Sequence, residues 1–308
     1  MIKKTLLGTL LLLLVAGCAK APVTGRTQLM MISPQQEQAM GLRTEKMILQ
    51  KEKLSKDPVF TERVQRIGMR IAKATGLKLD WKFYAIEKPD VPNAFCLANG
   101  HVFVYSGILK YASNDDQLAT VMAHEIGHAV AHHVAEQVSV ALMTQLVTTA
   151  AAIAIQHNVH SSSEQTAYML ALGLGANLGV VLPYSRMMES EADHIGLVLM
   201  TKACYDPREA VAFWKKFAKK GGEPPVYFST HPSSAQRVAN LKKLMPDAMR
   251  LYKEEGCDAR RQTAPSKRTL DEDTASRTPS QSDDMTGYRV PRKSIRSESY
   301  NPLIGPGY

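Results

Sequence analysis

The alternation of apolar and polar positions along the chain predicts a mainly helical fold. Residues 33–56 carry a helical pattern that opens with Ser33 and Pro34, and proline suits the first turn of a helix. The same periodicity predicts helices over residues 58–75, 114–134, 138–156, 167–178, 186–202, 207–220 and 233–255. We expect Ser113 to cap the helix at 114–134, and we expect Pro183 to break the helical pattern ahead of residue 186.

One part of the chain alternates with the period of a β-strand. Over residues 77–84, apolar side chains stand at every second position, as in a half-buried strand. Two further strands are predicted over residues 94–97 and 101–105, joined by the turn-forming pair Asn99-Gly100. We therefore expect an α+β, mainly helical fold that contains a small antiparallel β-meander.

The first residues have the pattern of a secretory signal. A positively charged start precedes an apolar run over residues 6–16. This run is too short to cross a bilayer, which takes about 20 helical residues. Residues 15–18 read Val-Ala-Gly-Cys and resemble a bacterial lipobox, in which the cysteine becomes the lipidated first residue of the mature chain.

A lipid anchor such as palmitate on Cys18 would hold the protein on a membrane rather than through it. Ala19 stands where an aspartate would resemble an inner-membrane retention signal. We therefore expect a lipid-anchored protein of the outer membrane that faces the periplasm of a Gram-negative bacterium.

These observations divide the chain into four parts. Residues 1–17 are the predicted signal peptide, residues 18–32 a tether and residues 33–257 the folded domain. Residues 258–308 lack Trp and Phe and are rich in polar residues. Because they cannot bury enough apolar surface to fold, we expect them to be disordered.

The net positive charge of the chain bears on which partners it can bind. The formal net charge of +9 falls to +7 once the two lysines of the signal are removed. A secreted lipoprotein does not meet nucleic acid, so weak attraction to anionic membrane surfaces explains this charge better. We expect no nucleic-acid partner.

The cysteines allow at most one internal disulfide, because three remain beyond Cys18. We expect Cys204 to pair with Cys257. Cys96 lies in an apolar run and is expected to be a buried thiol.

The strongest chemical signal is the H-E-x-x-H sequence at residues 124–128, which lies on a predicted helix. His124 and His128 are four residues apart, so both imidazoles project from one face and can hold one metal ion. Glu125 lies beside that face, where a carboxylate can take a proton from a water molecule. We expect a catalytic zinc site with one ion per chain.

A catalytic zinc site requires a third protein ligand, and Glu189 is the best candidate. Asp193 lies four residues further along the same helical face. One carboxylate can therefore bind the metal while the other orients a ligand histidine. Glu191 points elsewhere and is expected to be solvated.

Two more histidines lie one turn beyond the motif. His132 shares the face of the first two histidines but stands about 12 Å from His124 along a helix, too far to share one ion. We interpret His132 and His133 as histidines that face solvent or support a ligand.

Residues 138–156 form an apolar stretch that Ser, Thr and Gln side chains interrupt. A transmembrane helix is one interpretation, but the polar residues and the lipid anchor favour a core or cavity-lining helix. Whether the apolar segment 138–182 plugs the active-site cleft or touches a membrane stays open at this stage.

Residues 124–128 together with the E-x-x-A-D sequence at 189–193 resemble the gluzincin zinc metallopeptidases of the HtpX and CAAX prenyl-protease family. Within that family the BepA-like periplasmic lipoprotein branch is the most similar. The resemblance extends over about residues 34–244. It implies a zincin-like metallopeptidase core with the H-E-x-x-H sequence on its active-site helix.

Two other segments carry the same resemblance. Asn93-Ala94-Phe95, with residues 100–104, is similar to the family's strand segment before the zinc helix and implies a strand whose edge pairs with extended substrate. Cys96 and Leu97 depart from the family pattern, which can alter this edge. The helical-repeat domain of some relatives is expected to be absent, because the core ends near residue 257.

The sequence Ser-Thr-His-Pro at residues 229–232 resembles the family's downstream histidine-proline motif. The resemblance implies a catalytic role for His231, either as a donor to the oxyanion or as a reversible fourth ligand. Arg237 is expected to pair with a carboxylate of the site or of the substrate, and an ordinary surface arginine is the alternative.

The leading hypothesis is a membrane-anchored zinc-dependent endopeptidase that hydrolyses unfolded or misassembled envelope proteins in protein quality control. The alternative is a chaperone-like binding factor for outer-membrane protein assembly, with a closed and mostly inactive zinc site and the assembly machinery as partner. A purely structural metal site is disfavoured, because two histidines and one glutamate beside a free glutamate make an open site.

Overall fold

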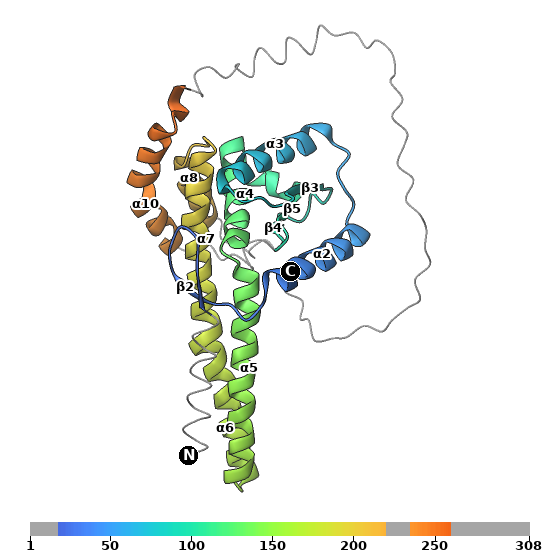
Figure 1. Cartoon of the computed structure of the whole chain (residues 1–308), viewed down its shortest axis with the longest axis vertical. Helices are drawn as coiled ribbons and strands as arrows, with labels where there is room; N and C mark the ends of the chain where they lie inside the picture. The colour runs from blue at the N-terminus through green and yellow to red at the C-terminus, as the bar shows by residue number, and fades with distance from the viewer. Residues whose placement is uncertain (1–17, 220–234, 260–308) are drawn as a thin grey trace. The chain divides into compact units, whose positions relative to one another are not determined.

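The computed structural model describes residues 18–219 and 235–259 (Figure 1). The described residues up to Cys257 pack into one unit, and most of them are helical, which confirms the α+β, mainly helical class. The helices are α2 (Pro34–Lys51), α3 (Pro58–Thr75), α4 (Asp115–Val130), α5 (His133–Asn158), α6 (Ser162–Ala176), α7 (Leu182–Lys202), α8 (Arg208–Lys219) and α10 (Ala235–Glu254), with the short turns η1 (Ser106–Lys110) and η2 (Asn177–Val181). The strands are β1 (Cys18–Lys20), β2 (Thr27–Leu29), β3 (Lys82–Ile86), β4 (Ala94–Cys96) and β5 (His101–Tyr105).

The main sheet has three strands in the order β3-β5-β4. β4 and β5 are antiparallel, and Gly100 between them has a φ of 84°, so the predicted Asn99-Gly100 turn is confirmed. The expected antiparallel meander is wrong in one respect, because β3 pairs with β5 in parallel. All residues of β5 are buried. This strand therefore takes the centre of the sheet, and β3 and β4 flank it.

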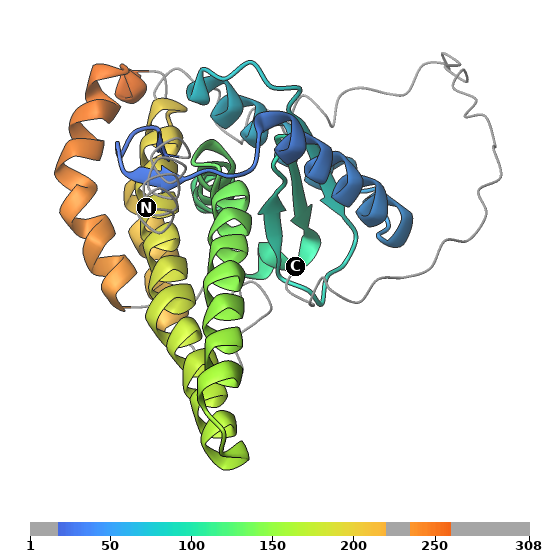
Figure 2. The same ribbon diagram turned by 60° about the horizontal axis from the view of Figure 1, so that its bottom comes forward.

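Helices cover both faces of this sheet (Figure 2). On one face, α3 and α4 share an apolar core with side chains such as Phe83, Ala94 and Val102. On the other face, Phe103 belongs to a second apolar cluster against which Ile48 of α2 packs. The sheet therefore holds α4 against the edge strand β4.

α4 carries the H-E-x-x-H sequence, and its two ends are set by local signals. Asn114 caps it instead of Ser113, because the Asn114 side chain accepts a hydrogen bond from the Gln117 N–H at 2.8 Å. The Ser113 hydroxyl donates to the Gln117 side chain. The helix ends at Val130, and His132 has a left-handed φ of 55°, so α5 begins as a separate helix.

α5 and α6 form a helical hairpin that extends away from the sheet (Figures 1 and 2). The expectation of a core or cavity-lining helix is wrong. In α5 the buried residues are His133, Ala135, Glu136 and Ser139, and no residue of α6 is buried. By length and composition, α5 and the continuous helix Ser162–Lys202 could each cross a membrane.

The expected break at Pro183 is also wrong, because α6, η2 and α7 form one continuous helix. Pro183 lies in the first turn of α7, directly after the π-helical turn Asn177–Val181. A π-turn shifts the backbone hydrogen bonds by one residue, so the helix can continue although proline has no N–H to donate. The hairpin therefore continues without interruption into the helix that carries Glu189.

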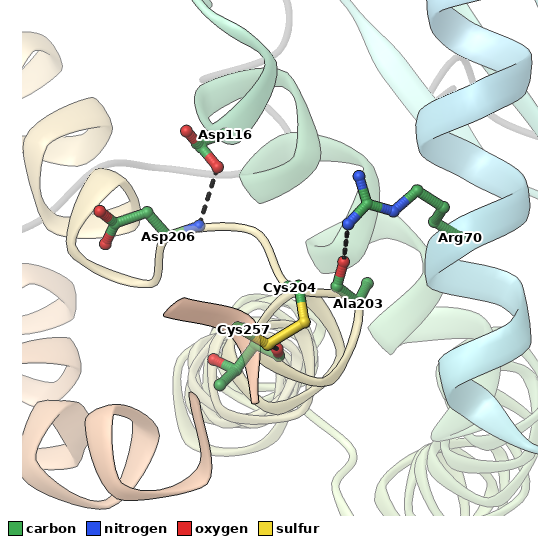
Figure 3. Close-up of a disulfide and its surroundings, with 7 residues drawn as sticks. Arg70, Asp116, Ala203, Cys204, Asp206 and Cys257 are labelled. Carbon is green, nitrogen blue, oxygen red and sulfur yellow. Dashed lines mark hydrogen bonds between the residues drawn. A yellow bond between two sulfur atoms is a disulfide. The ribbon is translucent and has the colours of Figure 1, made fainter. Parts of the chain in front are cut away.

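A disulfide ties the end of α10 to the end of α7 (Figure 3). Cys204 and Cys257 are bonded, with Cα atoms 5.1 Å apart, which confirms the predicted pair. Beside it, the Asp206 N–H donates to the Asp116 carboxylate of α4 at 2.8 Å. These contacts fasten α7, α10 and the start of α4 to one another.

Candidate metal centre and active site

The side chains of His124, His128 and Glu189 come together between α4 and α7. Nε2 of His124 lies 3.2 Å from Nε2 of His128. The two carboxylate oxygens of Glu189 each lie 3.3 Å from one of these nitrogens. His124, Glu189 and the neighbouring Glu125 are buried, while 13% of the His128 side chain is exposed. Donor atoms from two helices therefore converge on one point, and His128 is the most exposed of the three residues that supply them.

This donor set fits a zinc ion. Two ligand atoms about 2.1 Å from a tetrahedral zinc ion are about 3.4 Å apart, close to the observed separations of 3.2 and 3.3 Å. Two imidazoles and one carboxylate leave a fourth position for water, as catalytic zinc sites do. Burial lowers the pKa of His128 to about 3, so its ring is neutral and able to act as a ligand.

Glycines let the two ligand-bearing helices approach closely. A Cβ atom on Gly127 would lie 2.9 Å from the carbonyl oxygen of Ala192. A Cβ atom on Gly196 would lie 2.9 Å from the backbone nitrogen of His124. Real Cβ atoms do not approach backbone atoms this closely, so α4 and α7 can cross at this distance only with glycine at both positions. The crossing brings Glu189 within reach of the histidines.

Asp193 and Arg237 contact the candidate metal ligands His124 and Glu189. Oδ1 of Asp193 lies 3.1 Å from Nδ1 of His124. Arg237, on α10, donates to both oxygens of Asp193 at 2.6 and 2.7 Å and lies 3.0 Å from Glu189. Its guanidinium also lies over the ring of Trp214, 3.7 Å from the centroid. Arg237 is buried, so of the expected alternatives the structure has the pairing with site carboxylates and not a surface arginine.

These charges act strongly on His124. Burial and the Arg237 charge both oppose its protonation, but hydrogen bonds with Asp193 and Glu189 outweigh them and raise its pKa to about 9. Burial acts to raise the pKa of Asp193, but the Arg237 charge and hydrogen bonds hold it below its ordinary value. A metal cation and a proton therefore compete for the Nε2 nitrogen of His124.

β4 lies at an edge of the described sheet and offers backbone groups there. The backbones of Asn93 and Leu97 form hydrogen bonds with residues of β5 and its turn. In an antiparallel pair such bonds recur at every second residue, so Phe95 also bonds β5. The backbone groups of Ala94 and Cys96 consequently point away from β5, and both residues are buried.

This edge strand lies close to the Glu125 carboxylate. Burial raises the pKa of the Cys96 thiol well above its ordinary value, and the nearby charge of Glu125 raises it further. Ala94 and Cys96 are part of the core shared with α4, whereas Phe95 stacks on Phe103 at a centroid distance of 5.2 Å. Phe95 therefore packs on the second apolar cluster, and the backbone groups of its two buried neighbours point away from β5.

The sequence can now be compared with those of known proteins. Residues 58–245 match peptidase family M48. The chain belongs to this family. It is 33% identical to "Mitochondrial metalloendopeptidase OMA1" of Saccharomyces cerevisiae, over 81% of this chain and 77% of that protein. The protein of the same name in Schizosaccharomyces pombe is 35% identical, over 66% of this chain and 57% of that protein.

A bacterial protein shows the same relationship at lower identity. The M48 chain is 26% identical to "Beta-barrel assembly-enhancing protease" of Escherichia coli, over 61% of this chain and 39% of that protein. The predicted resemblance to gluzincin metallopeptidases is confirmed, and the M48 chain is a metalloendopeptidase. It spans only part of the length of each of these relatives.

The M48 chain supports His128 through His133, which is one of the two alternatives expected for this histidine from the sequence. Nδ1 of His133 lies 2.8 Å from Nδ1 of His128, and Nε2 of His133 lies 3.1 Å from Glu191. The expectation that Glu191 is solvated is wrong, because it is only 6% exposed. The partners of Glu191 lie on α5 and near the N-terminal strands, so the periodicity of α7 alone could not indicate that Glu191 is buried. His132, by contrast, is partly exposed and bonds Glu37 at 2.9 Å.

Arg26 joins the N-terminal strands of the M48 chain to both helices of this cluster. It donates to both oxygens of Glu136 at 2.6 Å and bonds Glu191 at 2.5 and 2.8 Å. Tyr184 also donates to Glu136, at 2.6 Å. Burial acts to raise the pKa of Glu191, but hydrogen bonds from His133 and Arg26 lower it to about 2. The donor atoms of His133, Glu136 and Glu191 lie close enough to hold an ion, but Arg26 already supplies the positive charge.

Two predicted residues are not among those that the structure places at this site. His231 falls outside the described residues. Cys18 is the first residue of β1, which pairs with β2 through Cys18 and Leu29. The metal-site geometry therefore comes from α4, α7 and α10, with α5 and the N-terminal strands behind it.

Proposed function

We propose that this metalloendopeptidase holds one zinc ion between His124, His128 and Glu189 and cleaves unfolded or misassembled envelope proteins. The observation that carries the proposal is the convergence of three donor atoms at separations that match zinc, beside a buried carboxylate on the same helix. Residues 33–257 form the peptidase domain in this proposal.

The residues of the chain have distinct roles in the reaction. When bound, zinc supplies the positive charge that makes water acidic near neutral pH and polarises the scissile carbonyl. The Glu125 carboxylate accepts a proton from the attacking water and passes it to the leaving amine. Asp193 keeps the hydrogen of His124 on Nδ1, so that Nε2 faces the metal. His231 is proposed as a donor to the oxyanion or as a reversible fourth ligand.

The substrate binds in an extended form along β4. The backbone groups of Ala94 and Cys96 that point away from β5 pair with a peptide strand once it displaces what buries them, and Asn93, Ala94 and Phe95 define its track beside Glu125. Backbone pairing accepts many sequences, which suits unfolded proteins as substrates. The name of the Escherichia coli relative, which refers to assembly of β-barrels, supports outer-membrane proteins and their assembly machinery as partners.

A lipid on Cys18 anchors the peptidase to the outer membrane, on the periplasmic side. The lipobox-like sequence that ends at Cys18 supports this part of the proposal. Mass spectrometry of the N-terminal peptide tests it. An acylated cysteine is expected in the parent chain and must be missing from Cys18→Ser, and an unmodified Cys18 in the parent would refute the anchor alone.

The peptidase activity is tested with casein as an unfolded substrate. Glu125→Gln is expected to abolish cleavage while zinc content, measured by elemental analysis, stays at one ion per chain. Glu164→Gln, an exposed residue far from the site in sequence, is the matched control and should cleave like the parent. If Glu125→Gln cleaved as fast as the parent, the hydrolytic role of Glu125 would be wrong. If the zinc-loaded parent bound casein without cleaving it, the chaperone-like alternative would replace the proposal.

A further inference from the structure

The hairpin formed by α5 and α6 presents an apolar surface on all sides. No residue from 140 to 187 is buried. Seven large apolar side chains along it are between 45 and 64% exposed: Leu142, Leu146, Val147, Ile153, Leu170, Leu174 and Leu178. A surface helix of a water-soluble domain carries one apolar stripe, whereas a helix that is apolar all round belongs in a core or a membrane.

Polar and charged residues gather at the two ends of the hairpin. Between Gln137 and Ser185 the sequence has a single charged side chain, Glu164, which lies near the turn between α5 and α6. The ten residues from 157 to 166 at this tip are polar except for Val159. Tyrosines lie just inside each end, Tyr168 near the tip and Tyr184 near the root. Aromatic residues favour these depths in a bilayer.

The length of the hairpin matches the apolar layer of a membrane. Residues 138–156 of α5 rise about 28 Å in helical form, against about 30 Å for the hydrocarbon core of a bilayer. Both legs are helical throughout, and η2 keeps the second leg continuous. Their backbone groups are therefore bonded within each helix, as the bilayer interior requires.

The root of the hairpin lies at the strands that carry Cys18. The Met31 N–H, just after β2, donates to Oγ of Ser139 at 2.8 Å, and β2 pairs with β1 through Leu29 and Cys18. Lys20, the last residue of β1, and Arg186, in the second turn of α7, are both exposed. A lipid on Cys18 and the apolar hairpin would thus start from the same side of the protein.

We propose that the hairpin at residues 138–182 inserts into the apolar layer of a lipid bilayer. A second copy of the chain would cover one stripe of each helix, whereas lipid covers all sides, as the distribution of exposed apolar residues requires. The orientation rests on the proposed lipid on Cys18, but insertion does not. The metal centre lies next to the root, because α5 begins just after α4 ends and α6 continues through η2 into α7. A membrane-bound peptidase would therefore act close to the bilayer surface.

Depth-dependent fluorescence quenching tests the proposal in the full chain. Leu146→Cys and Leu170→Cys are labelled with an environment-sensitive dye and reconstituted into vesicles of phosphatidylethanolamine and phosphatidylglycerol. Both labels are expected to shift to the blue, to lose fluorescence when the lipids carry a mid-chain nitroxide, and to resist aqueous iodide. Val59→Cys, which is 73% exposed on α3, is the control and should respond only to iodide. The parent chain gives the background from its own cysteines.

Two outcomes would overturn insertion. Hairpin labels that iodide quenches as it quenches Val59→Cys would place the hairpin in water. Labels that resist both quenchers, in a chain that chemical cross-linking joins into dimers, would make a second copy the occupant. Casein cleavage and acylation of Cys18 are measured on the same samples. If lipid nitroxides quenched the hairpin labels but the chain neither cleaved casein nor carried an acylated Cys18, the proposed function would be refuted and the insertion of the hairpin would still hold.

Discussion

Nδ1 of His133 lies 2.8 Å from Nδ1 of His128, and this contact connects a proposed zinc ligand to the buried Glu191. When Nε2 of His128 faces the metal, its Nδ1 carries the hydrogen and donates it to His133. His133 then donates from Nε2 to Glu191, at 3.1 Å. Both rings are neutral in this arrangement, so one carboxylate fixes the orientation of two imidazoles.

His133→Phe removes the acceptor for His128 but keeps an aromatic ring in the buried space. We expect zinc affinity to fall about 10–100-fold, the usual effect of losing a partner behind a metal ligand. Competition with a chromophoric chelator measures this directly, without reference to activity. His132→Phe, in which the replaced side chain is 45% exposed, serves as the control and should keep parental affinity. Equal affinities in both variants would contradict a positioning role for His133.

Gly196→Ala tests the close crossing of α4 and α7. The new Cβ would lie 2.9 Å from the backbone nitrogen of His124, so the helices must separate. We expect a loss of about 1–3 kcal/mol in unfolding free energy together with weaker zinc binding, measured by urea unfolding and chelator competition. Gly173→Ala is the matched control, because a Cβ there meets no atom of the described chain within 4 Å. Similar effects from both substitutions would show that the crossing is not the cause.

The features that the sequence predicted correctly depend on local signals. α3 spans Pro58–Thr75 because Asp57 caps its start and Gly76, with a φ of 69°, ends it. The H-E-x-x-H sequence places both imidazoles on one helical face by spacing alone. The confirmed pairing of Cys204 with Cys257 is the exception, because it joins residues 53 positions apart and was expected from the number of cysteines alone.

The features that the sequence missed depend on contacts between distant segments. Glu191 is buried because Arg26, far away in the sequence, reaches it from the N-terminal strands. β3 has a parallel neighbour because β5, the strand that is buried throughout, takes the centre of the sheet and lies next to β3 in place of β4. The alternation within β3 does not reveal this strand order. The exposure of residues 140–187 was missed because an apolar helix has the same sequence pattern in a core as in a membrane.

Arg26→Gln leaves Glu136 and Glu191 buried without their cation. We expect a loss of about 3 kcal/mol near neutral pH, the cost typical of breaking a buried ion pair, measured by thermal unfolding. Hydrogen bonds hold the pKa of Glu191 at about 2 in the folded chain, against an ordinary value of 4.5. A carboxylate with a lowered pKa stabilises the fold above its ordinary pKa and loses this effect as the pH falls towards the folded value.

The difference in stability between the parent and Arg26→Gln should therefore be largest near neutral pH and shrink from pH 4.5 towards about 2. Arg250→Gln, which removes an exposed arginine from a surface pair with Asp247, is the control. It should show little loss at any pH, because exposed pairs contribute little. A difference that stays constant through the acidic range would show that the charges of the two glutamates are not what Arg26 stabilises.

Cys257→Ala removes the bond that ties the end of α10 to α7. The disulfide closes a loop of 53 residues, for which loss of chain-entropy restriction costs about 4 kcal/mol. At about 2–4 °C per kcal/mol for a domain of this size, the melting temperature should fall by about 8–16 °C. A reductant should produce the same fall in the parent and none in the variant. Zinc affinity should change little, because Arg237 lies near the opposite end of α10 and is held there by Asp193, Glu189 and Trp214. A large loss of zinc affinity in Cys257→Ala would show instead that the disulfide, and not those contacts, holds α10 against the metal centre.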